Sequence, residues 1–181
     1  RSLVKNEISP FPLLLIDLGA TRTSFIIFSG HSLKFTSSMA VSSRNFTEAI
    51  SANLKINFEE AEKIKRKYGL DDKTNQKIED ISKEAGKKEE VFESLVPCLA
   101  DLISQVKKYT DYYQTHSSHD HLMQDSKGFK KILLSGGGAN LKGMAGFLSS
   151  ELRIPVELAN PWVNILPKDK REVPGLPFEN S

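Results

Sequence analysis

The sequence predicts an α/β domain in which a mixed sheet is flanked by helices. Short apolar runs of strand length lie near both ends of the chain, and apolar residues at helical spacing fill the part between them. Two of the strand-like runs end in glycine turns. The 181 residues are enough for one substantial domain, or for two small subdomains that share a core.

Composition narrows the class of protein. Hydrophobic residues make up 39% of the chain and charged residues 27%, as in ordinary globular proteins. The net charge of +2 comes from interleaved Lys and Glu, which gives no argument for nucleic-acid binding. The longest apolar run is strand-sized, and no signal peptide is predicted. Cys98 is the only cysteine, which excludes an internal disulfide and favours a reducing cytoplasm.

The first forty residues predict three strands. Residues 13–17 (LLLID) form an apolar run that ends in a carboxylate and is soon followed by a glycine, as a buried strand does when it stops at a turn. Residues 24–28 and 33–40 predict two further strands, joined by a hairpin turn at Ser29-Gly30-His31. The polar turn between the first two strands is therefore the first candidate site.

The middle of the chain predicts two short helices and a charged segment. Apolar residues recur at helical spacing from Asn45 onward. A second helix is predicted from Phe58, with Asn57 as its N-cap and Gly69 as its end. Residues 71–90 carry many charges of both signs and few apolar residues, which predicts a solvated loop and a short helix.

The strongest helical signal lies in residues 91–113. One face of this helix is lined by Val91, Leu95, Leu99, Leu102, Val106, Tyr109 and Tyr113. Pro97 is expected either to kink this helix or to lie in the first turn of a helix that starts later.

The last part of the chain alternates again between strand and helix. Residues 131–135 (KILLS) predict a buried strand, which is followed by three glycines and by a helix at 141–152. Residues 154–158 predict a final strand, and the proline-containing tail from Asn160 is expected to be extended.

The turn after the first strand, Asp17 to Thr23, has the chemistry of an anion site. Gly19 lets the backbone come close to an anion, and Ala20 and Thr21 offer backbone N–H groups. Asp17 could hold a hydrated Mg²⁺. An ordinary hairpin turn is the competing interpretation, because Asp-x-Gly is common.

The second glycine turn, Ser135 to Asn140, leads into a helix. Its three glycines, Gly136, Gly137 and Gly138, permit flat approach to a planar ligand such as adenine, and Asn140 is a natural N-cap. The turn is neither a Walker A loop nor a dinucleotide fingerprint, because the Lys-Ser/Thr pair and the glycine spacing are absent. A tight strand-to-helix connection is the competing interpretation.

The helix at 58–68 offers a third set of polar groups. Helical spacing puts Glu62 and Lys65 on one face, with Arg66 beside them. A carboxylate and an ammonium can share ribose hydroxyls, and a guanidinium can stack on a purine. A solvated Lys/Glu helix is the competing interpretation.

Taken in this order, these motifs resemble the second half of the actin, Hsp70 and sugar-kinase superfamily. Within it the chain is similar to the PilM family of type IV pilus assembly proteins, which are relatives of FtsA. The segments that carry this resemblance are 15–24, 58–70, 131–143 and 155–162. It implies an actin-like (ribonuclease H-like) fold, with a main subdomain (2A) at 1–42 and 88–181 and a small, mostly helical inserted subdomain (2B) at 43–87.

The resemblance also implies ATP and Mg²⁺ as cofactors of the intact protein. The residues it implies for nucleotide binding are Asp17, Gly19, Ala20, Thr21, Arg22, Glu62, Lys65, Arg66, Gly136, Gly137, Gly138 and Asn140. Asp17 is also the implied Mg²⁺ residue, acting through water. The implied role is an ATP-binding scaffold with weak ATPase activity at most. The implied location is the cytoplasmic face of the inner membrane, held there by a PilN-like partner, with self-association as a further expectation.

The family pattern places a first phosphate loop upstream of residue 1, in the half that also holds most of the partner groove. The isolated chain is therefore expected to bind ATP weakly or not at all and not to hydrolyse it. Two alternatives stay open from the sequence. One is a small-molecule kinase of the same superfold, and the other is an interaction module that keeps the fold but has lost nucleotide binding.

Overall fold

A computed structural model describes residues 9–30, 32–70, 81–116 and 128–160 of the chain. Five strands form one mixed sheet in the order β3-β2-β1-β4-β5. The predicted α/β class with a mixed sheet flanked by helices is confirmed. The three N-terminal strands pair antiparallel, whereas β4 and β5 run parallel to β1. Strand β1 is therefore central, with the antiparallel hairpins on one side and the parallel strands on the other.

The strands lie where the apolar runs predict them, but β1 and β2 are longer than predicted and β4 and β5 are shorter. Their bounds are β1 Ser9–Leu18, β2 Thr23–Gly30, β3 Ser32–Met39, β4 Ile132–Ser135 and β5 Val156–Leu158. In the register, Asp17 lies opposite Ser24 on β2 and opposite Ser135 on β4. Because β1 and β4 are parallel, the two glycine turns that follow them leave the sheet at the same edge.

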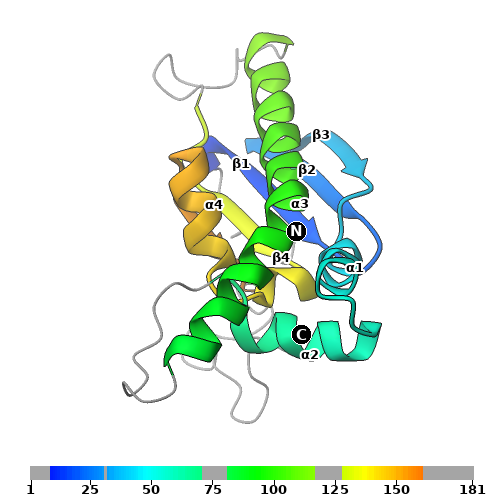
Figure 1. The fold of residues 1–181 in the computed structure, drawn as a ribbon. Helices are drawn as coiled ribbons and strands as arrows, with labels where there is room; N and C mark the ends of the chain where they lie inside the picture. Colours follow the sequence, from blue (N-terminus) through cyan, green and yellow to red (C-terminus); the bar gives the residue numbers. More distant parts are fainter. Residues whose placement is uncertain (1–8, 31, 71–80, 117–127, 161–181) are drawn as a thin grey trace.

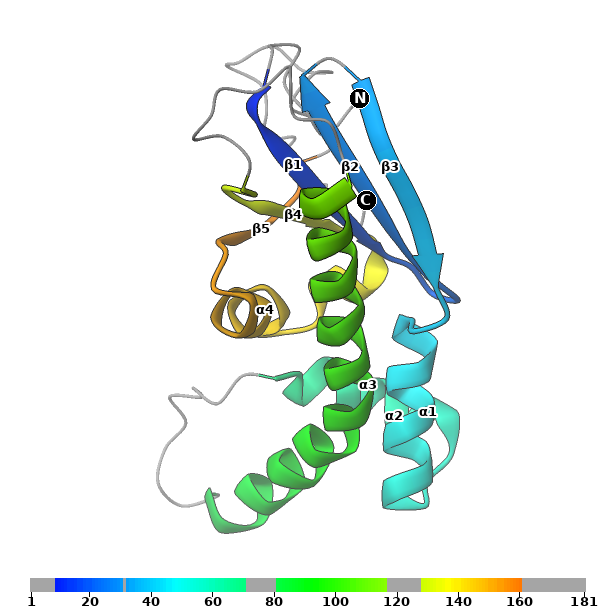
Figure 2. The same cartoon turned by 90° about the horizontal axis from the view of Figure 1, so that it is seen from above.

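Helices α3 (Ile81–His116) and α4 (Met144–Leu152) cover one face of the sheet, where they lie side by side (Figures 1 and 2). On β1 the side chains of Leu14, Ile16 and Leu18 point into this core, and those of Leu13 and Leu15 belong to a smaller cluster on the other face. This alternation is what a strand buried on both faces requires. The largest fully buried side chain of the core is Tyr113 of α3.

The long helix begins earlier than the sequence predicts. Of the segment predicted as a solvated loop and a short helix, residues 71–80 lie outside the described part, and residues 81–90 are helical but form the start of α3 instead of a separate short helix. Lys, Glu and Ala are good helix formers, so a helix can run on into solvent without a periodic apolar face. Pro97 lies inside this helix, not in its first turn. Figure 2 shows α3 bending along its length, as expected for a helix interrupted by proline.

Helices α1 (Ser43–Leu54) and α2 (Phe58–Tyr68) lie beyond the end of the sheet where β1 stops (Figure 1). Helix α2 has the predicted ends, because the Asn57 side chain accepts a hydrogen bond from the backbone N–H of Glu60 and Gly69 ends the helix at φ 60°. Helix α1 is capped in the same way by Ser42. Their apolar faces join the main core through Phe46, Ile50 and Ala61, among others. The division into two subdomains stays a prediction.

None of the helices in the described ranges is both long and apolar enough to span a membrane.

Candidate functional site

A cavity of about 700 Å³ opens at the edge of the sheet where β1 and β4 end. Three parts of the chain form its wall: the β1–β2 turn, helices α1 and α2, and the segment that begins with η2, a 3₁₀ turn at Gly137–Asn140. The residues that line it are Ala20, Thr21, Ser43, Arg44, Thr47, Phe58, Glu62, Lys65, Arg66, Gly137, Gly138, Asn140, Leu141 and Lys142. Its volume suits a small-molecule ligand.

The β1–β2 turn is held against the first turn of α1. Within the turn, the Gly19 N–H donates to the Arg22 carbonyl over 3.0 Å, and a Cβ at Gly19 would lie 2.9 Å from that same oxygen. The turn's own carbonyls then accept from α1: Ser43 N–H binds Gly19 O at 3.0 Å and Arg44 N–H binds Ala20 O at 3.1 Å. The position of this turn therefore depends on the start of α1.

The glycines after β4 have two different environments. A Cβ at Gly136 would lie 2.5 Å from Asp17 Oδ1, and one at Gly138 would lie 2.6 Å from the Leu18 side chain. These two glycines therefore let the loop pack on the end of β1. At Gly137 a Cβ would meet nothing within 4 Å, and this residue lines the cavity. Of the three, Gly137 is the glycine that leaves open space for a ligand.

Asn140 does not cap a helix, so that prediction is wrong. It is the last residue of η2, after which Leu141 is extended, and α4 begins after Gly143, which has φ 78° and no side-chain cap. The backbone N–H groups of Ala139 and Leu141 close the 3₁₀ turn on Gly136 O and Gly138 O. A turn that satisfies its own backbone in this way needs no side-chain cap. Asn140 is exposed and lines the cavity instead.

A polar cluster on α2 faces the cavity. Glu62 Oε2 lies 2.7 Å from Lys65 Nζ and accepts from Thr47 Oγ1 at 2.5 Å, while Glu62 Oε1 lies 2.9 Å from Arg66 Nε. The side chains of Glu62 and Arg66 are 27% and 78% exposed, whereas that of Lys65 is 6% exposed. The cluster therefore has a buried cation, a half-buried carboxylate and an outer guanidinium.

Burial and hydrogen bonding within this cluster shift the pKa values of Glu62 and Lys65. Burial alone would raise the pKa of Glu62, but hydrogen bonds from Lys65, Thr47 and Arg66 outweigh it and lower that pKa to about 2. Burial lowers the pKa of Lys65, and the pairing with Glu62 opposes this shift in part. Glu62 is therefore ionised at neutral pH and stays a hydrogen-bond acceptor.

The far end of α2 is fixed to the segment after η2. A Cβ at Gly69 would lie 2.6 Å from both Lys142 Cβ and Lys142 O, and Leu70 N–H donates to Lys142 O over 2.7 Å. In return Lys142 Nζ donates to Lys67 O at 3.0 Å. Two walls of the cavity are therefore joined, and Gly69 is needed there for close approach as well as for its φ.

The structure brings together residues that the sequence places far apart. Those predicted residues that line the cavity are Ala20, Thr21, Glu62, Lys65, Arg66, Gly137, Gly138 and Asn140. The predicted residues that do not line it are Asp17, Gly19, Arg22 and Gly136. Their roles in binding stay predictions.

Sequence reasoning missed the contribution of α1 and Lys142. The lining residues not predicted are Ser43, Arg44, Thr47, Phe58, Leu141 and Lys142. A signal for α1 was present, because Ser43 and Thr47 fall at helical spacing on the same stripe as Phe46 and Ile50, which puts two hydroxyl groups on the buried face of α1.

The electrostatics of the wall favour an anion. Its cationic residues are Arg44, Lys65, Arg66 and Lys142, opposed within the wall by Glu62. The Arg44 guanidinium lies 5.6 Å from the Phe58 ring centroid at the rim. Within the described residues there is no group of three or more His, Cys, Asp or Glu side chains that could hold a metal ion. A Mg²⁺ ion would therefore need ligand phosphates and water in addition to Asp17, which is how Mg²⁺ is usually held beside nucleotides.

The sheet order, the flanking helices and a cavity between two glycine turns define the fold of the actin-like ATPases. The family model described as "Cell division protein FtsA" matches residues 14–174 of the 181, and the chain belongs to this family. None of the curated proteins compared with the chain matches it at a significant level.

Solved structures support the same fold. The chain is similar to a structure of the "PilM-PilN type IV pilus biogenesis complex", with 23% identity and a TM-score of 0.65 over 84% of this chain and 37% of that one. MreB 5 of Spiroplasma citri bound to AMPPNP matches with 20% identity and a TM-score of 0.67, over 90% and 52%. The "MamK double helical filament" matches with 14% identity and a TM-score of 0.61, over 81% and 49%. The chain thus spans about half or less of each of these proteins.

Proposed function

We propose that this chain forms the adenosine side and the second phosphate turn of an ATP cleft in an actin-like scaffold protein. The observation that carries the proposal is the cationic cavity of about 700 Å³ bounded by the β1–β2 turn, α2 and the glycine turn after β4. Anionic ligands are favoured by such a wall, and the open space at Gly137 leaves room for a planar group.

Each part of the wall suits one part of ATP. The ionised Glu62 is an acceptor for ribose hydroxyls, and the exposed Arg66 guanidinium can stack on the base beside Gly137. On this proposal the backbone N–H groups of Ala20 and Thr21, which line the cavity, bind phosphate oxygens, and Asp17 near the end of β1 holds Mg²⁺ through water. ATP bound here would supply the phosphate charge that sets the protein's conformation and assembly state.

We further propose that the scaffold acts in type IV pilus assembly. The support is the fold match to the PilM–PilN complex, combined with the motifs in residues 15–24 and 58–70. On this proposal the partner is a PilN-like protein of the inner membrane. The protein then lies at the cytoplasmic face of that membrane through its partner and is able to self-associate.

Isothermal titration calorimetry with Mg·ATP tests the nucleotide part. The full-length protein is expected to bind ATP, and this chain alone is expected to bind it weakly or not at all. Asp17→Ala and Glu62→Ala in the full-length protein should each weaken binding roughly tenfold or more. Lys63→Ala, an exposed change on the outer side of α2, should leave binding unchanged. Unchanged ATP affinity in both Asp17→Ala and Glu62→Ala would contradict the proposal.

A second candidate function is an interaction module that keeps the fold without nucleotide. The observation in its favour is that Gly136 and Gly138 are already explained by their packing on Asp17 and Leu18. If the full-length protein bound no ATP but still bound a PilN-like N-terminal peptide, this second function would stand. Peptide binding is measured by fluorescence anisotropy. Failure to bind the peptide would instead remove the pilus assignment.

A further inference from the structure

Lys65 has more hydrogen-bond acceptors around its ammonium than it has protons. Nζ lies 2.7 Å from Glu62 Oε2, 2.8 Å from Thr47 Oγ1, and 3.0 Å from both the carbonyl and the hydroxyl oxygen of Ser43. An ammonium group has three N–H donors. All three are therefore used within the protein, although Lys65 lines the cavity and stands where a ligand contact is expected.

We propose that Lys65 is a positioning residue, not a ligand of the nucleotide. In this role its ammonium fixes the Glu62 carboxylate for the ribose and ties α2 to the start of α1, which in turn holds the β1–β2 turn. This inference rests on the proposed function for its ligand, but the contacts that carry it lie within the protein.

The first link runs from Lys65 to Glu62. Both Lys65 Nζ and Thr47 Oγ1 bind the same oxygen, Glu62 Oε2, and leave Oε1 to the exposed Arg66 side chain. An exposed Arg on a surface pair is easily displaced, since such pairs are weak. Glu62 therefore keeps one oxygen anchored and one oxygen available at the cavity.

The second link runs from Lys65 to the turn that is proposed to face the phosphates. Lys65 Nζ binds both oxygens of Ser43, whose own N–H donates to Gly19 O at 3.0 Å. The next residue, Arg44, donates to Ala20 O at 3.1 Å. A single buried cation thus connects the ribose side of the cavity to the β1–β2 turn.

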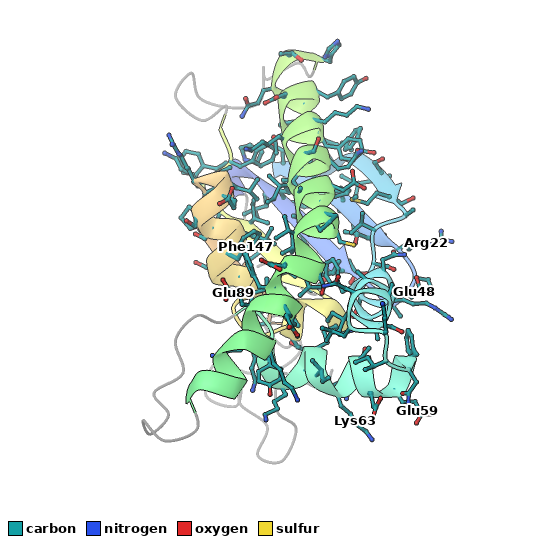
Figure 3. The ribbon with its side chains drawn as sticks, viewed as in Figure 1. Arg22, Glu48, Glu59, Lys63, Glu89 and Phe147 are labelled. Carbon is teal, nitrogen blue, oxygen red and sulfur yellow. The ribbon has the colours of Figure 1, made fainter. Side chains whose placement is uncertain are left out.

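The test compares Lys65→Gln and Lys65→Met with Lys63→Gln in the full-length protein. Figure 3 shows that Lys63 points away from α2 into solvent, so its loss removes a charge from the same helix without breaking the cluster. Lys65→Gln keeps an amide that can donate to Ser43 or Thr47, which guards against a variant that fails to fold.

The first measurement is amide hydrogen exchange without nucleotide. The Ser43 and Arg44 amides should exchange at least about tenfold faster in the Lys65 variants than in Lys63→Gln, because they lose the anchor on Ser43. The Phe147 amide, which donates to Gly143 O within the α4 region, should not change and serves as the reference for global unfolding. Equal exchange at Ser43 and Arg44 in all variants would overturn the link to the turn.

The second measurement is the affinity for adenosine, which has no phosphate and so reports the nucleoside side alone. Lys65→Gln should weaken adenosine binding roughly tenfold when Glu62 is present and less than about twofold in a Glu62→Gln background. An equal loss in both backgrounds would mean that Lys65 contacts the nucleoside directly, and the positioning role would be wrong. If the unmutated protein bound neither adenosine nor ATP, the proposed function would fail, while hydrogen exchange would still decide whether Lys65 anchors the turn.

Discussion

Gly136 lies so close to Asp17 that a Cβ on the glycine would stand 2.5 Å from the Asp17 Oδ1 atom. The backbone of Gly136 has φ 87°, and the neighbouring Leu18 carbonyl would lie 2.6 Å from the same Cβ. Beside them, the Ser135 hydroxyl donates a 3.4 Å hydrogen bond to Asp17 Oδ1. The ends of β1 and β4 are thus packed together at the edge where the cavity opens.

This packing predicts that alanine substitution has a large effect on stability at Gly136 and a small one at Gly137. Gly136→Ala should lower the free energy of unfolding by about 3 kcal/mol, because it combines an unfavourable φ with a clash against the end of β1. Gly137→Ala should change stability by less than about 1 kcal/mol, because a Cβ there meets nothing within 4 Å. Urea denaturation of both variants measures the difference. Similar losses in both would contradict the assignment of packing to one glycine and open space to the other.

The contact between α2 and the segment after η2 predicts that replacing Gly69 by alanine lowers the stability of the protein. Gly69→Ala should destabilise the protein by roughly 2–3 kcal/mol, since φ is 60° and the new Cβ would meet Lys142 at 2.6 Å. Gly86→Ala, in the exposed N-terminal part of α3, should stabilise it by about 0.5–1 kcal/mol through helix propensity. Thermal melts with matched buffer conditions check both signs. A neutral Gly69→Ala would mean that the two walls are not held together at this point.

Ionisation of Glu62 predicts a stability change in acid. Its pKa in the folded protein is about 2, below the ordinary 4.5, so its ionised form stabilises the fold. That contribution is complete above about pH 4.5 and is lost as the pH falls toward 2. The stability gap between the unmutated protein and Glu62→Gln should therefore shrink by roughly 1–2 kcal/mol over this window, after allowance for solvent screening. Chemical denaturation at pH 5 and pH 3 measures it, and an unchanged gap would show that Glu62 is not held by its partners.

Arg66 offers a test that separates binding from stability. Its side chain is 78% exposed, so Arg66→Ala should change the free energy of unfolding by less than about 0.5 kcal/mol. If it stacks on the base, the same change should weaken ATP binding by the full-length protein roughly threefold to thirtyfold. Calorimetry with ATP and a thermal melt on the same sample give both numbers, and Lys63→Ala is the matched control. Full affinity in Arg66→Ala would remove this residue from the site.

Patterns among residues close in sequence predicted most of the secondary structure. The period of apolar residues located the strands and the helices α1 to α4, and the cap at Asn57 and the stop at Gly69 were both found as expected. These features depend on neighbours within four residues, which a sequence shows directly. The errors occurred where a local signal was weak, as at the start of α3, or where two local signals competed, as at Asn140.

The order of elements, the two glycine turns and the polar face of α2 can all be predicted from spacing along the chain. What these groups contact depends on the packing of the folded chain. It placed Ser43 and Thr47 around Lys65, across 22 and 18 residues, and Asp17 beside Gly136, across a far longer stretch of chain. Such contacts arise from the packing of separate elements on a shared core, and no local pattern encodes them.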